Sequence, residues 1–80
     1  MKIDLSSPLR AAADGMGSFN VEARTIHELL QRLVERYPDM QKHIDQGIAV
    51  AIDGTIYRDD RSVEIPAGAE VYLLPRIQGG

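Results

Sequence analysis

The clearest pattern of hydrophobic and polar positions runs from Thr25 to Tyr37. Apolar residues recur there at the spacing of one helix face: Ile26, Leu29, Leu30, Leu33, Val34 and Tyr37. Thr25, followed three residues later by Glu28, matches the capping box that begins many helices. Pro38 disfavours helical geometry at the residue before it and so marks the end. The pattern predicts an amphipathic helix that buries one face against a sheet.

Alternating apolar and polar residues predict two strands before this helix. Residues 1–5 alternate with the period of a half-buried strand, and residues 6–8, Ser-Ser-Pro, end it. Residues 9–13 could form a helical turn, and the glycine-rich residues 14–18 form a turn. Residues 19–22 alternate again, which makes a hairpin of the two strands the simplest interpretation.

Three further strands are predicted after the helix. Residues 39–47 carry apolar positions at helical spacing, enough for a short second helix or an ordered loop. Residues 48–52 form a strand with large apolar side chains on one face and alanines on the other. Asp53-Gly54 is a strong signal for a two-residue hairpin turn, with residues 55–58 as the return strand. Residues 70–74 form the last strand.

These elements follow the order ββαβββ. One helix lying across a mixed sheet buries the helix stripe and the strand faces together, and the helix is a crossover long enough to let the first and last strands pair in parallel. The fold expected is therefore an α+β β-grasp, the ubiquitin-like fold, with residues 1–75 as one domain and residues 76–80 as a flexible tail. Four positions are expected in its core: Leu29, Leu33, Val50 and Val71.

Composition narrows the classes of function. Eighty residues with a formal net charge of −3 make one small domain without the basic surface that binds nucleic acid. The chain has no cysteine, which excludes disulfides, thiol nucleophiles and zinc–thiolate sites. It has no apolar run long enough to cross a membrane and no signal-peptide core at its start, so a cytoplasmic location without membrane contact is expected.

The end of the chain carries the candidate chemistry. Pro75 stops the last strand, and Arg76, Ile77 and Gln78 lead to Gly79-Gly80. Two residues without side chains can carry the carboxylate of Gly80 into a narrow site of another protein. A free α-carboxylate, with a pKa of roughly 3.3–3.7, is ionised at neutral pH and must be activated, most simply by ATP, before a nucleophile attacks it. The alternative is a frayed end without function.

Several segments together resemble a known family. They are Leu9-Arg10 with Gly15, Glu35-Arg36-Tyr37-Pro38, residues 50–54, and residues 66–75 leading to Gly79-Gly80. In this order, over essentially all 80 residues, the chain resembles the ubiquitin-like sulfur carriers of the MoaD and ThiS type. Its length and full-size helix are closer to MoaD-like small subunits of molybdopterin synthase.

The resemblance implies a function for Gly80. A ubiquitin-activating-type enzyme would adenylate its carboxylate with ATP, and a persulfide sulfur would displace AMP to leave a thiocarboxylate. The thiocarboxylate would donate sulfur in cofactor biosynthesis, most simply of the molybdopterin type, with a synthase large subunit as a further partner and no cofactor bound to the chain itself. The alternatives are sulfur delivery to thiazole, tRNA or cysteine synthesis, a ubiquitin-like modifier joined to lysines, and an interaction domain with an inert tail.

The last strand also offers a candidate docking surface. Tyr72 and Leu74 alternate with Val71 and Leu73, so one pair faces the helix and the other faces outward. The patch expected to bind a partner is Tyr72, Leu74 and Pro75, beside Ile77 and Arg76 of the tail. The alternative is that these are isolated exposed apolar side chains, which are common on protein surfaces.

No catalytic constellation is evident, so the chain is not expected to be an enzyme on its own. His27 and His43 fall in different elements without ligands at metal-binding spacing, and no metal site is expected. Asp59 and Asp60 are consecutive in a turn, so we expect them to point apart and to titrate normally.

Overall fold

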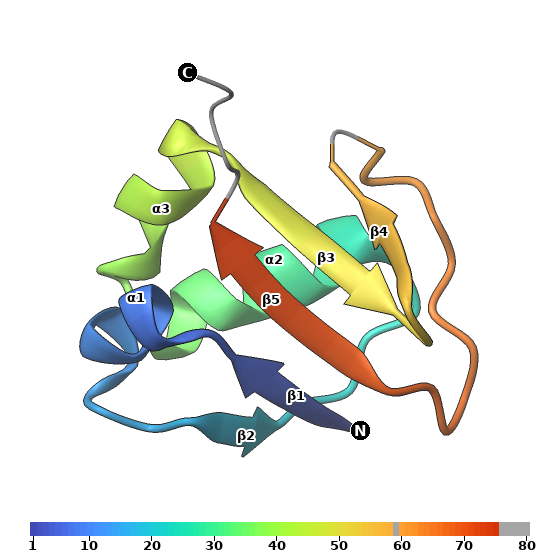
Figure 1. Ribbon diagram of the computed structural model, residues 1–80, viewed down its shortest axis with the longest axis horizontal. Helices are drawn as coiled ribbons and strands as arrows, with labels where there is room; N and C mark the ends of the chain where they lie inside the picture. The colour runs from blue at the N-terminus through green and yellow to red at the C-terminus, as the bar shows by residue number, and fades with distance from the viewer. Residues whose placement is uncertain (59, 76–80) are drawn as a thin grey trace.

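The computed structural model describes residues 1–58 and 60–75, and these form a sheet with helices on one side (Figure 1). The strands are β1 (Lys2–Leu5), β2 (Ser18–Asn20), β3 (Ile48–Ile52), β4 (Thr55–Tyr57) and β5 (Val71–Pro75). The helices are α1 (Ser7–Arg10), α2 (Ile26–Arg36) and α3 (Met40–Gln46), and a 3₁₀ turn over Ala11–Ala13 follows α1.

The five strands form one mixed sheet in the order β2-β1-β5-β3-β4. β1 and β5 pair in parallel, with Ile3 opposite Val71, and the other three pairings are antiparallel. The parallel pair lies in the middle of the sheet, because β2 occupies the outer side of β1 and β3 occupies the other side of β5. The crossover through α2 lets the chain return to the sheet in the direction that parallel pairing requires (Figure 1). This is the predicted β-grasp, and the order ββαβββ is confirmed.

The core lies between the sheet and α2. The four predicted core positions, Leu29, Leu33, Val50 and Val71, are all buried. Apolar side chains from every strand except β4, and from all three helices, join them in one continuous cluster. A single small core of this kind must be continuous because a chain of this length buries only about 60% of its unfolded surface.

At the start of α2 the Thr25 half of the predicted capping box is present, whereas Glu28 reaches back to the amide of Arg24, one residue before Thr25. The Thr25 hydroxyl oxygen accepts a hydrogen bond from the backbone N–H of Glu28 at 3.2 Å, and the Glu28 carboxylate accepts one from the N–H of Arg24 at 3.2 Å. Both bonds satisfy amides near the first turn that have no partner within the helix. At the other end the N–H of Tyr37 donates to the carbonyl of Leu33 at 2.8 Å, and the helix ends before Pro38.

The β3–β4 hairpin has the turn that its sequence predicts. Asp53 and Gly54 have positive φ angles of 49° and 89°, as the favoured two-residue turn requires. The same turn is tied to the start of β5, because Asp53 N–H donates to the carbonyl of Glu70 and the Asp53 carboxylate accepts from the N–H of Glu70, both at 2.9 Å. The hairpin tip is therefore held from two strands.

Two predictions of local structure need correction. Ser6-Ser7-Pro8 is not only the end of a strand: Ser6 is the N-cap of α1, and Pro8 lies in its first turn, where its missing N–H leaves no helical bond unmade. Pro75 does not lie beyond the last strand, because it is the final paired residue of β5, opposite Ile48. The choice left open for residues 39–47 is settled as a helix, α3.

Candidate functional site

The candidate site begins where β5 ends. β5 lies between β1 and β3, and its last residues, Leu74 and Pro75, pair with Ala49 and Ile48 at the start of β3. The predicted tail residues Arg76, Ile77, Gln78, Gly79 and Gly80 lie outside the described residues, so their roles stay predictions. The structure establishes that the described chain ends on a central strand, whose Val71–Leu73 pair with both β1 and β3 and whose Leu74 and Pro75 pair with β3 (Figure 1).

The structure decides which side chains of β5 point outward. Val71 and Leu73 are buried against the helices, whereas Tyr72 is 42% exposed and Leu74 and Pro75 are half-buried. Tyr72 and Leu74 therefore belong to the face of the sheet that no helix covers, whereas Pro75, opposite the buried Ile48, lies on the same face as Val71 and Leu73. Of the three residues predicted as a docking patch, Tyr72 and Leu74 share this open face, and Pro75 lies on the other face.

Apolar residues of two further strands extend this surface. Ala51 on β3 lies directly opposite Tyr72, and Ile56 on β4 lies directly opposite Ala51 with 52% of its surface exposed. We call the set Ile56, Ala51, Tyr72 and Leu74 the open-face patch. Neighbouring strands are about 4.8 Å apart, so Tyr72 and Ile56 stand about 10 Å from each other with only the small Ala51 between them.

The predicted patch omitted Ile56 and Ala51. The alternation of large residues and alanines along β3 placed Ala51 on the face opposite the core, and the short hairpin turn placed Ile56 beside it. Sequence reasoning could have found both by extending the β3 alternation across the Asp53-Gly54 turn, because the turn type fixes the register.

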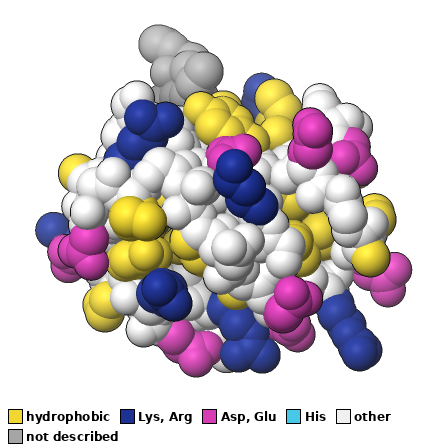
Figure 2. Space-filling model, turned by 90° about the horizontal axis from the view of Figure 1, so that it is seen from below, with side chains coloured by type: hydrophobic (Ala, Val, Ile, Leu, Met, Phe, Trp, Pro, Cys, Tyr) yellow, Lys and Arg dark blue, Asp and Glu magenta, His cyan; other side chains and the backbone are white. Residues whose placement is uncertain are grey.

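A charged residue of the neighbouring strand lies beside the open-face patch. Asp4 on β1 lies opposite Tyr72 on the side away from Ala51. On the face shown in Figure 2, Lys and Arg side chains are interspersed with Asp and Glu, and hydrophobic side chains form small groups among them. The side of the molecule seen in Figure 2 therefore has no uniformly positive surface of the kind that binds nucleic acid.

The remaining polar candidates do not form a site. His27 is exposed on α2 and His43 is half-buried on α3. Within residues 1–58 and 60–75, no three side chains of the metal-binding types come together, and no helix is long and apolar enough to cross a membrane. Asp60 does not titrate normally as predicted, because hydrogen bonds from the hydroxyl and the N–H of Ser62 lower the pKa of its carboxyl.

A β-grasp sheet with the last strand at its centre and an uncovered apolar face defines a ubiquitin-like protein. Comparison with protein families identifies the family within this fold, because the model of the ThiS family matches residues 9–80. The chain therefore belongs to the ThiS family, the MoaD/ThiS-type sulfur carriers. Comparison with the sequences of curated proteins finds no significant match.

Solved structures with the same fold cover nearly the whole chain. The small archaeal modifier SAMP1 from Haloferax volcanii matches with a TM-score of 0.76 at 24% identity, covering 100% of this chain and 98% of that one. A chain of the BexX/CysO complex from Amycolatopsis orientalis matches with a TM-score of 0.78 at 17% identity, covering 99% and 98%. A chain of the complex of subunits 1 and 2 of the molybdopterin-converting factor from Helicobacter pylori matches with a TM-score of 0.67 at 18% identity, covering 99% and 96%.

Proposed function

We propose that this protein carries sulfur as a thiocarboxylate on Gly80. The observation that carries the proposal is the ThiS-family match, which extends through Gly79-Gly80. The carboxylate of Gly80 attacks the α-phosphate of ATP in the active site of an adenylating partner, and pyrophosphate leaves. The terminal sulfur of a persulfide then attacks the acyl carbon and AMP leaves. A thiol cleaves the resulting acyl disulfide, which gives the thiocarboxylate and an ordinary disulfide.

The fold suits a carrier rather than a catalyst. The reacting carbon belongs to a residue without a side chain, and all acid–base groups and the nucleotide site come from the partner. The domain's contribution is to hold the base of the tail in one place, through the pairing of Leu74 and Pro75 with β3. Because the base of the tail is fixed to the sheet, the tail loses less orientational freedom when it enters the partner's site. Its two terminal glycines keep it thin enough to enter.

The open-face patch is proposed as the surface that the adenylating enzyme recognises. Its last residue along β5 is Leu74, two residues before the tail, so a partner bound to the patch lies close to where the tail begins. Tyr72 offers a large, rigid apolar surface with a polar tip, which is the residue type most enriched at binding hot spots. Two of the similar structures are complexes by their titles, BexX with CysO and subunit 1 with subunit 2 of a molybdopterin-converting factor, which supports a protein partner for this fold.

For the sulfur acceptor we propose a molybdopterin-type precursor, with a synthase large subunit as the second partner. The Helicobacter pylori complex supports this choice by its title and by a match over 99% of this chain. A second function has its own support, because two similar structures at 24% identity are described as small archaeal modifier proteins. In that case the nucleophile that attacks the adenylate is a lysine amine instead of a persulfide.

The docking part of the proposal is tested with Tyr72→Ser. Truncating this exposed ring should leave the melting temperature nearly unchanged and raise the KM of the adenylating enzyme for the carrier, measured as ATP–pyrophosphate exchange, by about tenfold or more. Met16→Ser is the matched control, since Met16 is 51% exposed outside the patch. Equal KM values for the two variants would contradict the assignment of the patch.

A further inference from the structure

β2 is one of the two outer strands of the sheet, and its outer side has no strand partner (Figure 1). On its inner side the carbonyl of Gly17 accepts a hydrogen bond from the N–H of Leu5 at 2.8 Å, and the N–H of Val21 donates to the carbonyl of the first residue at 2.9 Å. In an antiparallel ladder every second residue bonds the partner strand, so the backbone groups of residues 17, 19 and 21 point toward β1. The backbone groups of Ser18 and Asn20 therefore point away from the sheet.

The outward backbone groups of β2 have no hydrogen-bond partner among residues 1–58 and 60–75. Within these residues, no loop and no side chain bonds an N–H or C=O group of Ser18 or Asn20. Asn20 is exposed and Ser18 is half-buried, so solvent reaches both residues. An unpaired edge of this kind is a template for a further strand, which forms main-chain hydrogen bonds as it adds to the sheet.

Two hollows border β2, and both have accessible apolar side chains in their lining. One, of about 370 Å³, lies between β2 and α2 and includes Val21, which is half-buried. The other, of about 410 Å³, includes Met16, which is 51% exposed. The residues that line both hollows are Phe19, Asn20 and Arg36. A strand added beside β2 would therefore meet apolar side chains as well as unpaired backbone groups.

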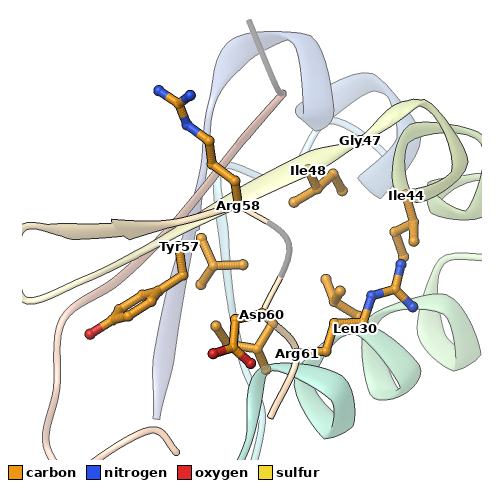
Figure 3. Close-up of a pocket in the computed structure, with 10 residues that line it drawn as sticks. Leu30, Ile44, Gly47, Ile48, Tyr57, Arg58, Asp60 and Arg61 are labelled. Carbon is orange, nitrogen blue, oxygen red and sulfur yellow. The ribbon is translucent and has the colours of Figure 1, made fainter. Parts of the chain in front are cut away.

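The other outer strand, β4, has a different neighbourhood. Figure 3 shows a hollow between Tyr57, at the end of β4, and Leu30 of α2, with Asp60 and Arg61 at its mouth. Leu30 and Ile44, which form part of its floor, are each more than nine-tenths buried. That hollow therefore presents charged side chains of both signs and almost no apolar surface. Of the two edges, β2 is the one that combines unpaired backbone groups with accessible apolar side chains.

Positive charge dominates the lining of the two hollows. Lys2, Arg32 and Arg36 line them together with one carboxylate, that of Glu35. All four residues are exposed, and none forms an ion pair with a described residue. Arg32 and Arg36 are four residues apart on α2, so they lie on one face of the helix, beside Phe19. A strand in this place would be favoured by acidic side chains that point toward α2.

We propose that β2 binds an extended acidic segment of a partner protein as a further strand of the sheet. Antiparallel pairing is the more stable of the two orientations, and in it two alternate residues of the segment bond Ser18 and Asn20. The residues between and beside these two point their side chains toward α2. The segment that fits has an apolar residue opposite Phe19 and an acidic residue two positions away on each side, near Arg32 and Arg36.

The other side of the added strand favours neither sign of charge. On the open face of the sheet, Lys2 lies opposite Asn20 and Asp4 lies opposite Ser18. A segment residue bonded to Ser18 or Asn20 would thus have one cation and one anion nearby. Small neutral residues with high strand propensity, such as threonine, suit these two positions.

A second copy of this chain is a poorer occupant of the edge. Two β2 strands paired antiparallel about a two-fold axis would place both α2 helices on the same side of the joint sheet. Arg32 and Arg36 of one copy would then face the same arginines of the other copy across the axis. Like charges in facing positions are destabilising, whereas an acidic segment replaces this repulsion with attraction.

The proposal is tested by NMR titration of the isotope-labelled full chain with the peptide acetyl-Ser-Asp-Thr-Val-Thr-Asp-Ser-amide. The amide resonances of Ser18 and Asn20 should shift, and their hydrogen exchange should slow, because binding gives their N–H groups a hydrogen-bond partner. The amide of Phe19 is the internal control, since it already points toward β1 and its exchange should change less. Unchanged Ser18 and Asn20 amides at about 2 mM peptide would overturn the proposal.

Modified peptides test the register and the charge separately. Methylating the backbone nitrogen of both threonines should abolish binding, whereas methylating that of the valine should leave the affinity within about threefold, because only the threonine N–H groups point toward β2. Replacing both aspartates with lysine should weaken binding about tenfold or more. Equal losses from the two methylations, or an equally tight lysine peptide, would overturn the proposal.

Matched variants of the protein separate charge at the site from net charge. Arg32→Gln with Arg36→Gln should weaken peptide binding about tenfold, whereas Arg24→Gln with Lys42→Gln, which removes the same charge elsewhere, should leave it within about twofold. Glu35→Gln should tighten binding. All five residues are exposed, so nearly unchanged melting temperatures are expected.

Two results with these variants would contradict the assignment of the edge. Equal losses in the two double variants would show attraction by net charge alone. A dimer of the unliganded chain in sedimentation experiments, dissociated by the peptide, would show that a second copy is the natural occupant of β2. None of these measurements involves Gly80, so they are independent of the proposed sulfur transfer.

Discussion

Replacing Leu33 with alanine tests the core of the fold directly. Leu33 lies in the middle of α2 and is completely buried. The substitution removes three carbon atoms, which at about 0.8 kcal/mol per methylene costs about 2.4 kcal/mol of transfer free energy. The cavity left behind adds to this, so that Leu→Ala changes in cores cost about 2–5 kcal/mol in total.

This loss is large for so small a domain. At roughly 0.05–0.15 kcal/mol per residue, 80 residues give a free energy of unfolding of about 4–12 kcal/mol. With a urea m-value of about 1 kcal/mol/M, a loss of 3 kcal/mol lowers the unfolding midpoint by about 3 M. Leu33→Ala should therefore be partly unfolded in little or no urea if the stability of the parent lies at the lower end of this range.

The assay is urea unfolding followed by far-ultraviolet circular dichroism at constant temperature. Gln31→Ala is the matched control, because Gln31 is exposed on the same helix and its truncation should change stability by less than about 0.5 kcal/mol. A loss below about 1 kcal/mol for Leu33→Ala, or equal losses for the two variants, would refute the packing of α2 described above.

Two further predictions concern local hydrogen bonds. Thr25→Ala should lower the free energy of unfolding by about 1 kcal/mol, because the Thr25 hydroxyl caps α2. Ser6→Ala should lower it little or not at all, because the buried Ser6 hydroxyl has no partner among the described residues. The urea midpoints of the two variants measure this difference, and equal losses would contradict the prediction. The lowered pKa of Asp60 means that its bonds with Ser62 stabilise the folded state above the ordinary aspartate pKa and lose this effect as the pH falls through the lower, folded-state pKa. An NMR titration should find the Asp60 pKa closer to the ordinary value in Ser62→Ala, and an unchanged pKa would show that the Ser62 hydroxyl is not its main cause.

Strong local signals made most of the fold predictable. α2 has a continuous apolar stripe and an N-cap at Thr25, and these two signals predict the same helix. The Asp53-Gly54 turn fixed the β3–β4 register. The position of β5 beside β1 followed from topology, because a helix crossover permits parallel pairing and the sheet must cover α2.

Weak or conflicting local signals left the rest open. Residues 39–47 have only Met40 and Ile44 at helical spacing, which also suits a loop, and packing against α2 and β3 makes the segment helical. Proline both ends strands and fits the first turn of a helix, so Pro8 by itself does not distinguish the two.

The candidate site was predictable to a similar degree. The alternation along β5 showed that one pair of side chains points outward, but only the position of α2 decides that the pair is Tyr72 and Leu74. Ile56 joined the patch through β3, a strand that is distant from β5 in the sequence and adjacent to it in the sheet. The chemistry of Gly80 remains a prediction from sequence and family.

The central claim, that Gly80 carries sulfur, is tested most directly by intact and tandem mass spectrometry. After incubation with its adenylating enzyme, ATP and a persulfide donor, the protein should gain the mass difference of one sulfur replacing one oxygen, and fragmentation should place the change on Gly80. A variant with one residue added after Gly80 should gain nothing while melting at the same temperature. If the extended variant acquires the same mass, or if the native chain is instead found joined to lysines, the thiocarboxylate assignment is wrong.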